Sequence, residues 1–316
     1  MEDYFKIKAL SASQLKHFIP PGSIVDFWQN CVFNPNQIEY LPSAAAEFGS
    51  LCHSMLLEPN LLDHDIAIWD PVDPKEEFVS RVLNGKLTKK YVNACEKNPG
   101  KRVVTKKEFD HAQLMIAALK NNCDVVGWLK GMTFEHEILI KSHPGMIYDT
   151  AFGTVSLPAK CKIDGVDLAQ LEANQKLPEN QRKTIKMVDY KTTCDINKVR
   201  DFSHTMGWHI QDAFYKKMVR LEHGECDIKF VFITQCSKPG KQHLIEIFEF
   251  DNMETMAWVD EKVEESMAMI AYKLAEFKQN NNLDVWQKPF RTDEPTSLDL
   301  TNSYMERVDK ALSLFT

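Results

Sequence analysis

Two stretches of alternating apolar and polar residues each carry an aspartate near their end, and this pair constrains the fold more than any other feature. The stretch 159–168 is AKCKIDGVDL, and the stretch 184–191 is TIKMVDYK. A period of two predicts β-strands, whose side chains alternate between faces, so Asp189 and Lys191 point the same way. If the two strands are neighbours, Asp164 joins them on that face. The sequence therefore predicts a sheet on which two carboxylates and an ammonium meet.

The other segments alternate between helix and strand patterns in an order that predicts a mixed α/β core preceded by helical additions. Helix patterns occupy 11–18, 43–58, 105–120, 204–222 and 252–279, and further strand patterns occupy 133–141, 228–235 and 243–250. Residues 70–104 are charged and irregular and predict an exposed excursion around short helices. The polar residues 168–183 predict a hairpin tip or an inserted loop.

Composition limits the classes of function. The formal net charge of −7 argues mildly against a nucleic-acid binder, although a bound metal ion can meet phosphates locally. No stretch approaches the roughly 20 apolar residues of a membrane span, and the first 16 residues have no apolar region of a secretory signal, so we expect a cytoplasmic protein. The eight cysteines are scattered without a C-x-x-C pair, which disfavours disulfide, zinc and iron–sulfur frameworks.

The aspartates and the lysine have a clear chemical use if they meet. Two carboxylates can hold a hard cation such as Mg²⁺ and leave positions for water and phosphate. A nearby ammonium can orient or deprotonate that water and offset charge that develops in the transition state. By itself D-x-K is common, and Asp189 and Lys191 are also compatible with a weak surface ion pair.

Other motifs in the same chain raise the weight of these three residues. Gly49 and His53 lie on the second predicted helix, and Glu137 lies in the strand before Asp164. Gln211 and Tyr215 are spaced i, i+4 on the helix after the D-x-K strand and share one face. Each has a structural alternative: the histidine can be a core residue, and the glutamine and tyrosine can pack the helix on the sheet.

In this order, the motifs G-x-x-x-H, E, D, D-x-K and Q-x-x-x-Y resemble the RecB-like branch of the PD-(D/E)XK nuclease superfamily. Within that branch the chain is most similar to the RecE-type exonucleases, the exonuclease VIII group of phages and prophages, over about residues 8–250. The local segments that carry this similarity are LSASQLK, FGSLCHSMLLEP, IDGVD, VDYKTT and WHIQDAFY. The resemblance implies a restriction-endonuclease-like α/β core, with a mixed central sheet flanked by helices. The gap between the two aspartates is longer than the short hairpin expected in that family.

The resemblance also implies a domain organisation and a role for each motif residue. We expect one nuclease domain over 1–280, with a helical part (1–130) and a catalytic core (131–280), followed by a tail (281–316) with a short amphipathic helix. The implied metal ligands are Asp164, Asp189, His53 and the backbone carbonyl of Tyr190. Lys191 is the implied catalytic lysine, and Gln211 and Tyr215 border the site and contact DNA. Glu137 is implied near the metal, although Glu135 shares its strand face, and the choice stays open.

The implied activity is that of a Mg²⁺-dependent exodeoxyribonuclease, with Mn²⁺ able to substitute. It would degrade linear double-stranded DNA from 5′ to 3′ and leave 3′ single-stranded overhangs. Such overhangs serve recombination by strand annealing, so a RecT-like annealing protein is the implied partner, and a ring-shaped homo-oligomer the implied assembly. Alternatives are a structure-specific or single-strand nuclease of the same superfamily, and a non-catalytic DNA-binding module on a nuclease-like fold.

Overall fold

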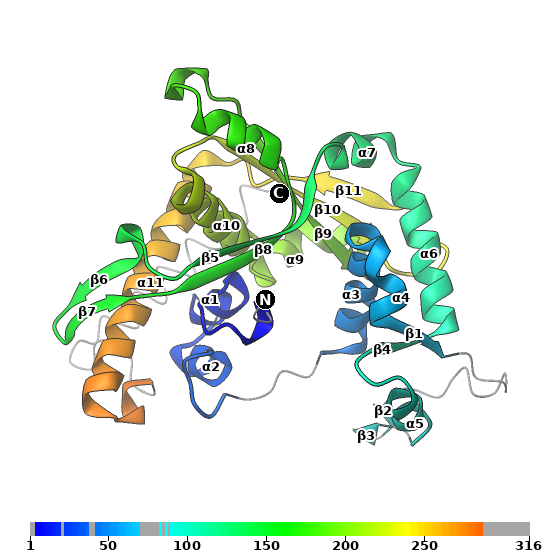
Figure 1. Cartoon of the computed structure of the whole chain (residues 1–316), viewed down its shortest axis with the longest axis horizontal. Helices are drawn as coiled ribbons and strands as arrows, with labels where there is room; N and C mark the ends of the chain where they lie inside the picture. The colour runs from blue at the N-terminus through cyan, green and yellow to red at the C-terminus, as the bar shows by residue number, and fades with distance from the viewer. Residues whose placement is uncertain are drawn as a thin grey trace.

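A computed structural model describes residues 4–19, 22–37, 42–69, 82–83, 86–87 and 89–286. Its centre is a five-stranded mixed sheet with the strand order β11-β10-β9-β8-β5 (Figure 1). The strands of this sheet are β5 (Thr133–Ile140), β8 (Ala159–Val166), β9 (Ile185–Thr193), β10 (Ile228–Cys236) and β11 (Ile245–Phe248). β9 and β10 run parallel, and the other neighbours are antiparallel. This arrangement confirms the predicted mixed α/β core.

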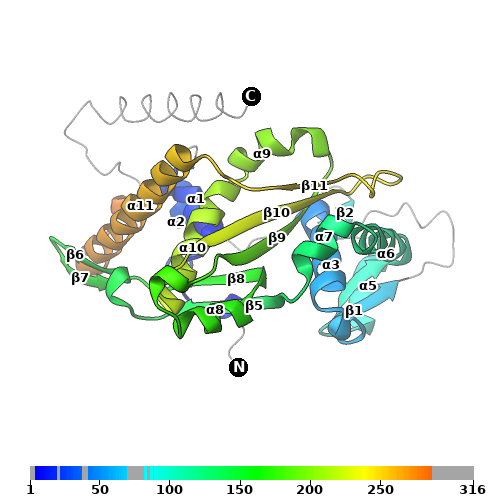
Figure 2. The same ribbon diagram turned by 90° about the horizontal axis from the view of Figure 1, so that it is seen from above.

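Helices cover both faces of the sheet (Figures 1 and 2). One face carries α1 (Ala12–Phe18), α2 (Ile24–Asn30), α10 (Trp208–His223) and α11 (Met253–Asn280). The other carries α3 (Ala44–Leu57), α6 (Lys106–Lys120) and α7 (Cys123–Leu129). Because strand side chains alternate, Phe230 and Phe232 of β10 enter the first core, and Val231 and Ile233 enter the second. The central strands are therefore buried on both faces.

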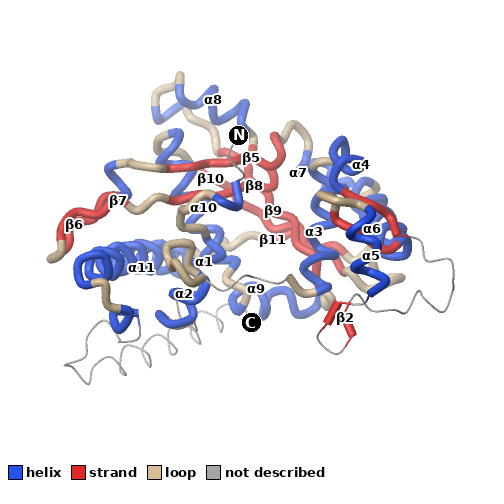
Figure 3. Tube along the Cα trace, turned by 60° about the horizontal axis from the view of Figure 1, so that its bottom comes forward, coloured by secondary structure: helices blue, strands red, loops and turns tan. Residues whose placement is uncertain are grey.

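The remaining elements are short and surround this core. The short helices are α4 (Leu62–Asp65), α5 (Lys89–Lys97), α8 (Leu168–Gln175) and α9 (Val199–Thr205). The 3₁₀ turns are η1 (Tyr4–Lys6), η2 (Pro59–Leu61), η4 (Pro144–Met146), η5 (Glu179–Gln181), η6 (Ile196–Lys198) and η7 (Leu283–Trp286). The small sheets pair β1 (Ile66–Trp69) with β4 (Arg102–Thr105), β2 (Val82–Leu83) with β3 (Lys86–Leu87), and β6 (Ile147–Thr150) with β7 (Gly153–Ser156). The β6–β7 hairpin lies beside α11 (Figure 3), where Phe152 meets Tyr272 edge-on at 5.2 Å between ring centroids.

Several local predictions are confirmed by their capping contacts. The predicted helix at 43–58 is α3, and the Ser43 side chain accepts a hydrogen bond from the N–H of Ala46. The helix at 105–120 is α6, and Thr105 and Glu108 form the predicted capping box. Such caps satisfy amide groups that no helical carbonyl can reach, so they mark where a helix begins.

Two local predictions are wrong, and a third is confirmed only in part. The polar segment 168–183 is not only a loop, because it contains α8, which begins where Asp167 accepts a hydrogen bond from the N–H of Gln170. The single helix predicted at 204–222 is two helices, α9 and α10, separated by Gly207 in the left-handed region at φ 73°. The excursion at 70–104 contains the short helix α5, as predicted, but it also contributes most of β4, which pairs with β1 in parallel register. Contacts with the rest of the protein stabilise these elements more than local periodicity does.

The pairing of β8 with β9 is short. Gly165↔Val188 and Val166↔Met187 are paired, and the N–H of Asp167 still donates to the carbonyl of Lys186, but the strands separate on the Asp164 side of these pairs. At the start of β8, the N-terminal segment pairs with this strand. The N–H of Leu10 donates to the carbonyl of Pro158, and the N–H of Lys160 donates to the carbonyl of Leu10, both at 2.8 Å. The sheet therefore opens between two of its central strands.

The predicted domain boundaries stay a prediction. The predicted amphipathic helix of the tail falls within residues 287–316, which lie outside the described residues. No described helix combines the length and the apolar composition that a bilayer crossing needs.

Candidate metal and catalytic site

Asp164 lies where β8 and β9 separate. It directly precedes Gly165, the last residue of β8 on that side to pair with β9, so in the extended register it stands opposite Asp189. The N–H of Tyr190 donates to Asp164 Oδ2 at 2.7 Å. A carboxylate thus continues the connection between the strands by a side-chain hydrogen bond, and two acidic groups are held close together in the opening.

Asp189 is almost completely buried, at 1% exposure, and is held from two sides. Gln211 of α10 donates from its side-chain amide to Asp189 Oδ2. Oδ1 lies 2.5 Å from the ammonium of Lys191 but accepts no hydrogen bond of normal geometry from any described residue. The predicted common face of Asp189 and Lys191 is confirmed by this contact, and one buried carboxylate oxygen keeps an incomplete set of partners.

His53 approaches from the helix on the other side of the opening. Its Nδ1 lies 3.4 Å from Asp164 Oδ2, and its ring centroid lies 5.1 Å from that of Tyr190. One turn earlier on α3, a Cβ at Gly49 would stand 3.0 Å from Thr192 Oγ1, so glycine allows the helix to pass close to β9. The G-x-x-x-H spacing brings the imidazole to the carboxylate.

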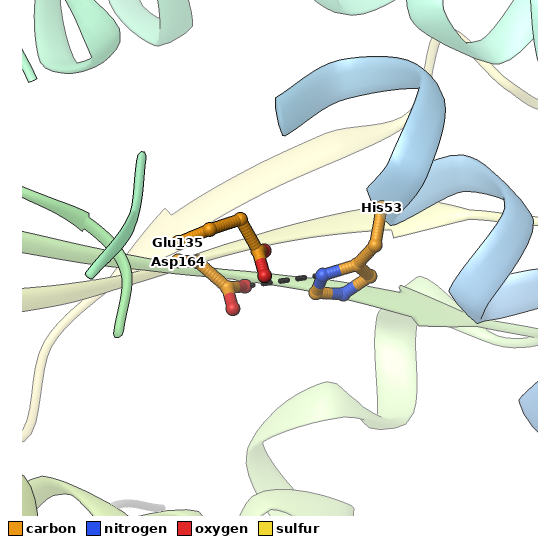
Figure 4. Close-up of side chains that lie close together, drawn as sticks. All are labelled: His53, Glu135 and Asp164. Atoms are coloured by element: carbon orange, nitrogen blue, oxygen red, sulfur yellow. Dashed lines mark ion pairs between the residues drawn. The ribbon is translucent and has the colours of Figure 1, made fainter. Parts of the chain in front are cut away.

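Glu135, and not Glu137, joins this cluster. His53, Glu135 and Asp164 each offer a ligand atom within 4.8 Å of the others (Figure 4). Glu135 has φ 55°, and apart from Asn281 it is the one described non-glycine residue with positive φ. A left-handed conformation changes the direction of a side chain and is rare outside glycine, so it often marks a functional position. Glu137 is exposed and pairs with Lys162 in the β5–β8 register.

The charges in the opening act strongly on one another. Burial and the charge of Asp189 raise the pKa of Asp164 well above its ordinary value, although Lys191 and the N–H of Tyr190 act in the opposite direction. Burial favours neutral Lys191, but Asp189 and Asp164 outweigh it and raise the pKa of that lysine. Burial and the charge of Lys191 lower the pKa of His53. At neutral pH the lysine is therefore an ammonium, and the histidine is a neutral potential ligand.

A family model described as a PDDEXK-like domain of unknown function (DUF3799) matches residues 11–282, which is most of the chain. The chain belongs to this family. The match supports the PD-(D/E)XK nuclease superfamily and does not single out the RecE type. It also confirms the predicted fold class, since the mixed sheet with helices on both faces is the one expected of a PDDEXK-like domain.

Other comparisons add little to the DUF3799 match. The crystal structure of a protein from Eubacterium rectale, provisionally named an exonuclease, is 15% identical over 93% of each chain, with a TM-score of 0.48. No curated protein matches the chain.

The two aromatic residues of the predicted set lie beside the acidic groups of this DUF3799 domain. Tyr215 stacks on Phe230 with 6.0 Å between ring centroids, and burial together with the charges of Asp189 and Asp164 raises the pKa of its hydroxyl. The Tyr190 hydroxyl donates to Gln235 Oε1 at 2.7 Å inside the core. The Tyr190 hydroxyl is thus satisfied in the core, while its ring lies beside that of His53 and its backbone N–H holds Asp164.

A divalent cation fits the residues present in the opening. His53, Glu135 and Asp164 offer an imidazole and two carboxylates that could share one ion. Asp189 is not one of these three, but its charge acts on Asp164 and its buried Oδ1 has an incomplete set of partners. Carboxylate oxygens are the ligands that Mg²⁺ and Mn²⁺ prefer. The residue that sequence reasoning overlooked is Lys162, which forms an ion pair with Glu135. Its position two residues before Asp164, on the same strand face by alternation, was the available signal.

Proposed function

We propose that this chain is a Mg²⁺-dependent deoxyribonuclease that hydrolyses phosphodiester bonds in the opening between β8 and β9. The observation that carries the proposal is the convergence of Asp164, Asp189 and Lys191 from two separating strands, with His53 from α3. Membership of the PDDEXK-like family supports it independently. Two acids and a lysine in one buried place are costly for folding, which favours a functional reason for keeping them.

Each residue has a definable task in this proposal. Asp164 and Asp189 would hold the metal. His53 from α3 and Glu135 from β5 would complete the protein ligands. When bound, the metal supplies a Lewis acid for the phosphoryl oxygen and lowers the pKa of a water molecule. Lys191 would donate hydrogen bonds to the water or to a phosphate oxygen and offset negative charge as it develops.

The remaining residues position these groups. Gln211 donates to Asp189 and so directs the other oxygen of that carboxylate toward Lys191. Tyr215 lies beside the acids on the next turn of α10, where it can border the path of a DNA strand. Glu137 is assigned no ligand role, because its side chain is exposed and stands opposite Lys162 in the β5–β8 register.

We propose linear double-stranded DNA as the substrate and 5′ to 3′ as the direction of digestion. Both proposals are supported by the ordered resemblance to RecE-type exonucleases. The same resemblance supports the 3′ overhangs, the RecT-like annealing partner and a ring-shaped oligomer. Recombination by strand annealing would follow from these products.

The test compares two DNA forms of one sequence. Purified protein is incubated with a linear duplex and with the same molecule as a covalently closed circle, with Mg²⁺, Mn²⁺ or a chelator. We expect degradation of the linear form only, and only with metal. End labels on either strand then report the direction, since 5′ labels should be released first.

Other outcomes separate the alternatives. Cleavage of the closed circle, or of single strands alone, would replace the exonuclease by a structure-specific or single-strand nuclease with the same site. Binding of DNA without cleavage under any metal condition would leave a non-catalytic DNA-binding module and contradict the proposal.

A further inference from the structure

We propose that Lys162 is a built-in counter-cation that competes with the divalent metal for Glu135 and thereby sets the metal affinity of the site. The inference rests on the proposed function, because it concerns the same metal ligands. It adds a residue that lies outside the motifs of the resemblance and gives it a regulatory task.

The geometry places the lysine on a metal ligand. The Lys162 ammonium forms an ion pair with Glu135, and both side chains are largely buried, at 24% and 17% exposure. Glu135 offers a carboxylate oxygen to the same small volume as His53 and Asp164. An ammonium and a divalent cation on one carboxylate repel each other, and partial burial weakens the screening between them.

Lys162 has another place to go. Glu137 stands directly opposite it in the antiparallel β5–β8 register, and such pairs lie on one face with Cβ atoms about 5 Å apart. The charges of Glu58 and Glu137 also act on the lysine, as does that of Glu135. When a metal occupies Glu135, the ammonium can therefore turn to Glu137 without being left unpaired. This gives the exposed Glu137 a role as the second partner of Lys162.

The exchange has a consequence for affinity. Part of the favourable energy of metal binding is used to separate Lys162 from Glu135, so the wild-type site binds metal more weakly than its ligands alone would allow. Removal of the ammonium should strengthen metal binding roughly tenfold or more. Removal of the alternative partner should weaken it by a factor of about two to three, because the lysine then stays on Glu135.

The experiment measures Mg²⁺ and Mn²⁺ binding to the full chain by titration calorimetry, without DNA. The variants are Lys162→Met, which has a similar length and no charge, Lys162→Arg, which keeps the charge, and Glu137→Gln. A matched control is Lys229→Met, which removes a lysine of β10 that pairs with Glu249 at 2.9 Å, with β9 between it and the strand of Lys162. Thermal unfolding with and without Mg²⁺ verifies folding and gives a second measure of affinity.

We expect tighter binding in Lys162→Met, near wild-type binding in Lys162→Arg and Lys229→Met, and weaker binding in Glu137→Gln. Equal or weaker binding in Lys162→Met would overturn the competition, and unchanged binding in Glu137→Gln would overturn the exchange partner. If the wild type and Lys162→Met both fail to bind either metal, the proposed metal site fails, and the counter-cation with it.

Discussion

The two sides of β9 differ in how far the strand is paired with its neighbours. Toward β10 it forms nine consecutive residue pairs in parallel register, from Ile228↔Ile185 to Cys236↔Thr193. Toward β8 it forms two pairs and then separates. The β10 side is lined by residues such as Phe232 and Ile233 that are completely buried, whereas the β8 side holds Asp164, Asp189 and Lys191.

The difference teaches where this fold obtains stability and where it keeps chemistry. Along β9–β10 backbone and apolar groups satisfy one another, as expected of a stable core. Along β8–β9 the Asp164 carboxylate accepts a hydrogen bond from the backbone N–H of Tyr190. The like charges of Asp164 and Asp189 are held together at a cost to folding. Local conflicts of this kind concentrate at functional sites, so stability and activity should be separable by substitution along one strand or the other.

The largest expected effect concerns the β8 side of β9, where the two strands separate. Asp189→Asn and Lys191→Met should each lower the rate of duplex degradation about a thousandfold or more, because each removes a charge that acts in the reaction. Thermal unfolding shows how much of each variant is folded, because removing one partner of this buried ion pair also costs stability, and the rate is compared per folded molecule. Part of the duplex binding should survive in a filter or anisotropy measurement. A rate near wild type in either variant would remove the site from the opening.

The next largest effect concerns the β10 side of β9, where the strands are paired along their length. Ile233→Ala should lower the free energy of unfolding by about 3 kcal/mol, because it removes a fully buried side chain from the second core. Urea unfolding measures this loss, and the rate of degradation per folded molecule should change less than tenfold. If the folded variant were inactive, the two sides of β9 would be coupled and the comparison would fail.

A smaller effect is expected at the last pair before the opening. A Cβ at Gly165 would stand 2.6 Å from Val188 Cγ2, so Gly165→Ala should cost about 2 kcal/mol and displace the adjacent Asp164. We expect the degradation rate to fall about tenfold. The double variant with Val188→Ala makes room for the new methyl group and should recover most of the activity. Without that recovery the clash is not the cause.

The smallest effect concerns pH. The pKa of Asp164 is raised by burial and by Asp189, so the folded protein holds this proton more tightly than the unfolded chain does. The stability that this provides is present below the ordinary carboxyl pKa and is lost as pH rises through the raised value. In a chelator, Asp164→Asn should therefore gain roughly 1 kcal/mol at neutral pH, the size of an ordinary single-site effect, while losing activity.

Unfolding of both proteins across this pH range checks that prediction. The wild type should lose stability relative to Asp164→Asn as pH rises from the ordinary carboxyl range. A constant difference between the two curves would mean that the proton on Asp164 has no part in it.

Sequence patterns were sufficient for some elements and not for others. The caps at Ser43 and Thr105 are local contacts, and the helices that they begin were predicted correctly. The helix α8 was missed, because its two turns are polar and are stabilised by burial of Leu171 and Asn174 rather than by an apolar face of their own. The break at Gly207 was missed as well, since a single glycine within a helical pattern does not by itself end a helix.

The candidate site, like the helices and strands, was predictable only where it depends on neighbouring positions in one segment. Alternation along β9 was enough to place Asp189 and Lys191 on one face, because that relation depends on two adjacent positions. The choice between Glu135 and Glu137 could not be made from alternation, because both lie on the same face of an ideal strand. The left-handed backbone at Glu135 is a tertiary feature and leaves no trace in the residue pattern.

The sequence by itself determined the types of the main helices and strands, the mixed α/β class and the carboxylate–lysine pair, because these depend on spacing along one segment. Only the tertiary structure decided that β8 and β9 are neighbours that separate at Asp164, that His53 reaches that carboxylate, and that Glu135 is held by Lys162. The physical reason is that strand order, strand separation and ion pairs between segments depend on the packing of the whole core, to which residues distant in the chain contribute.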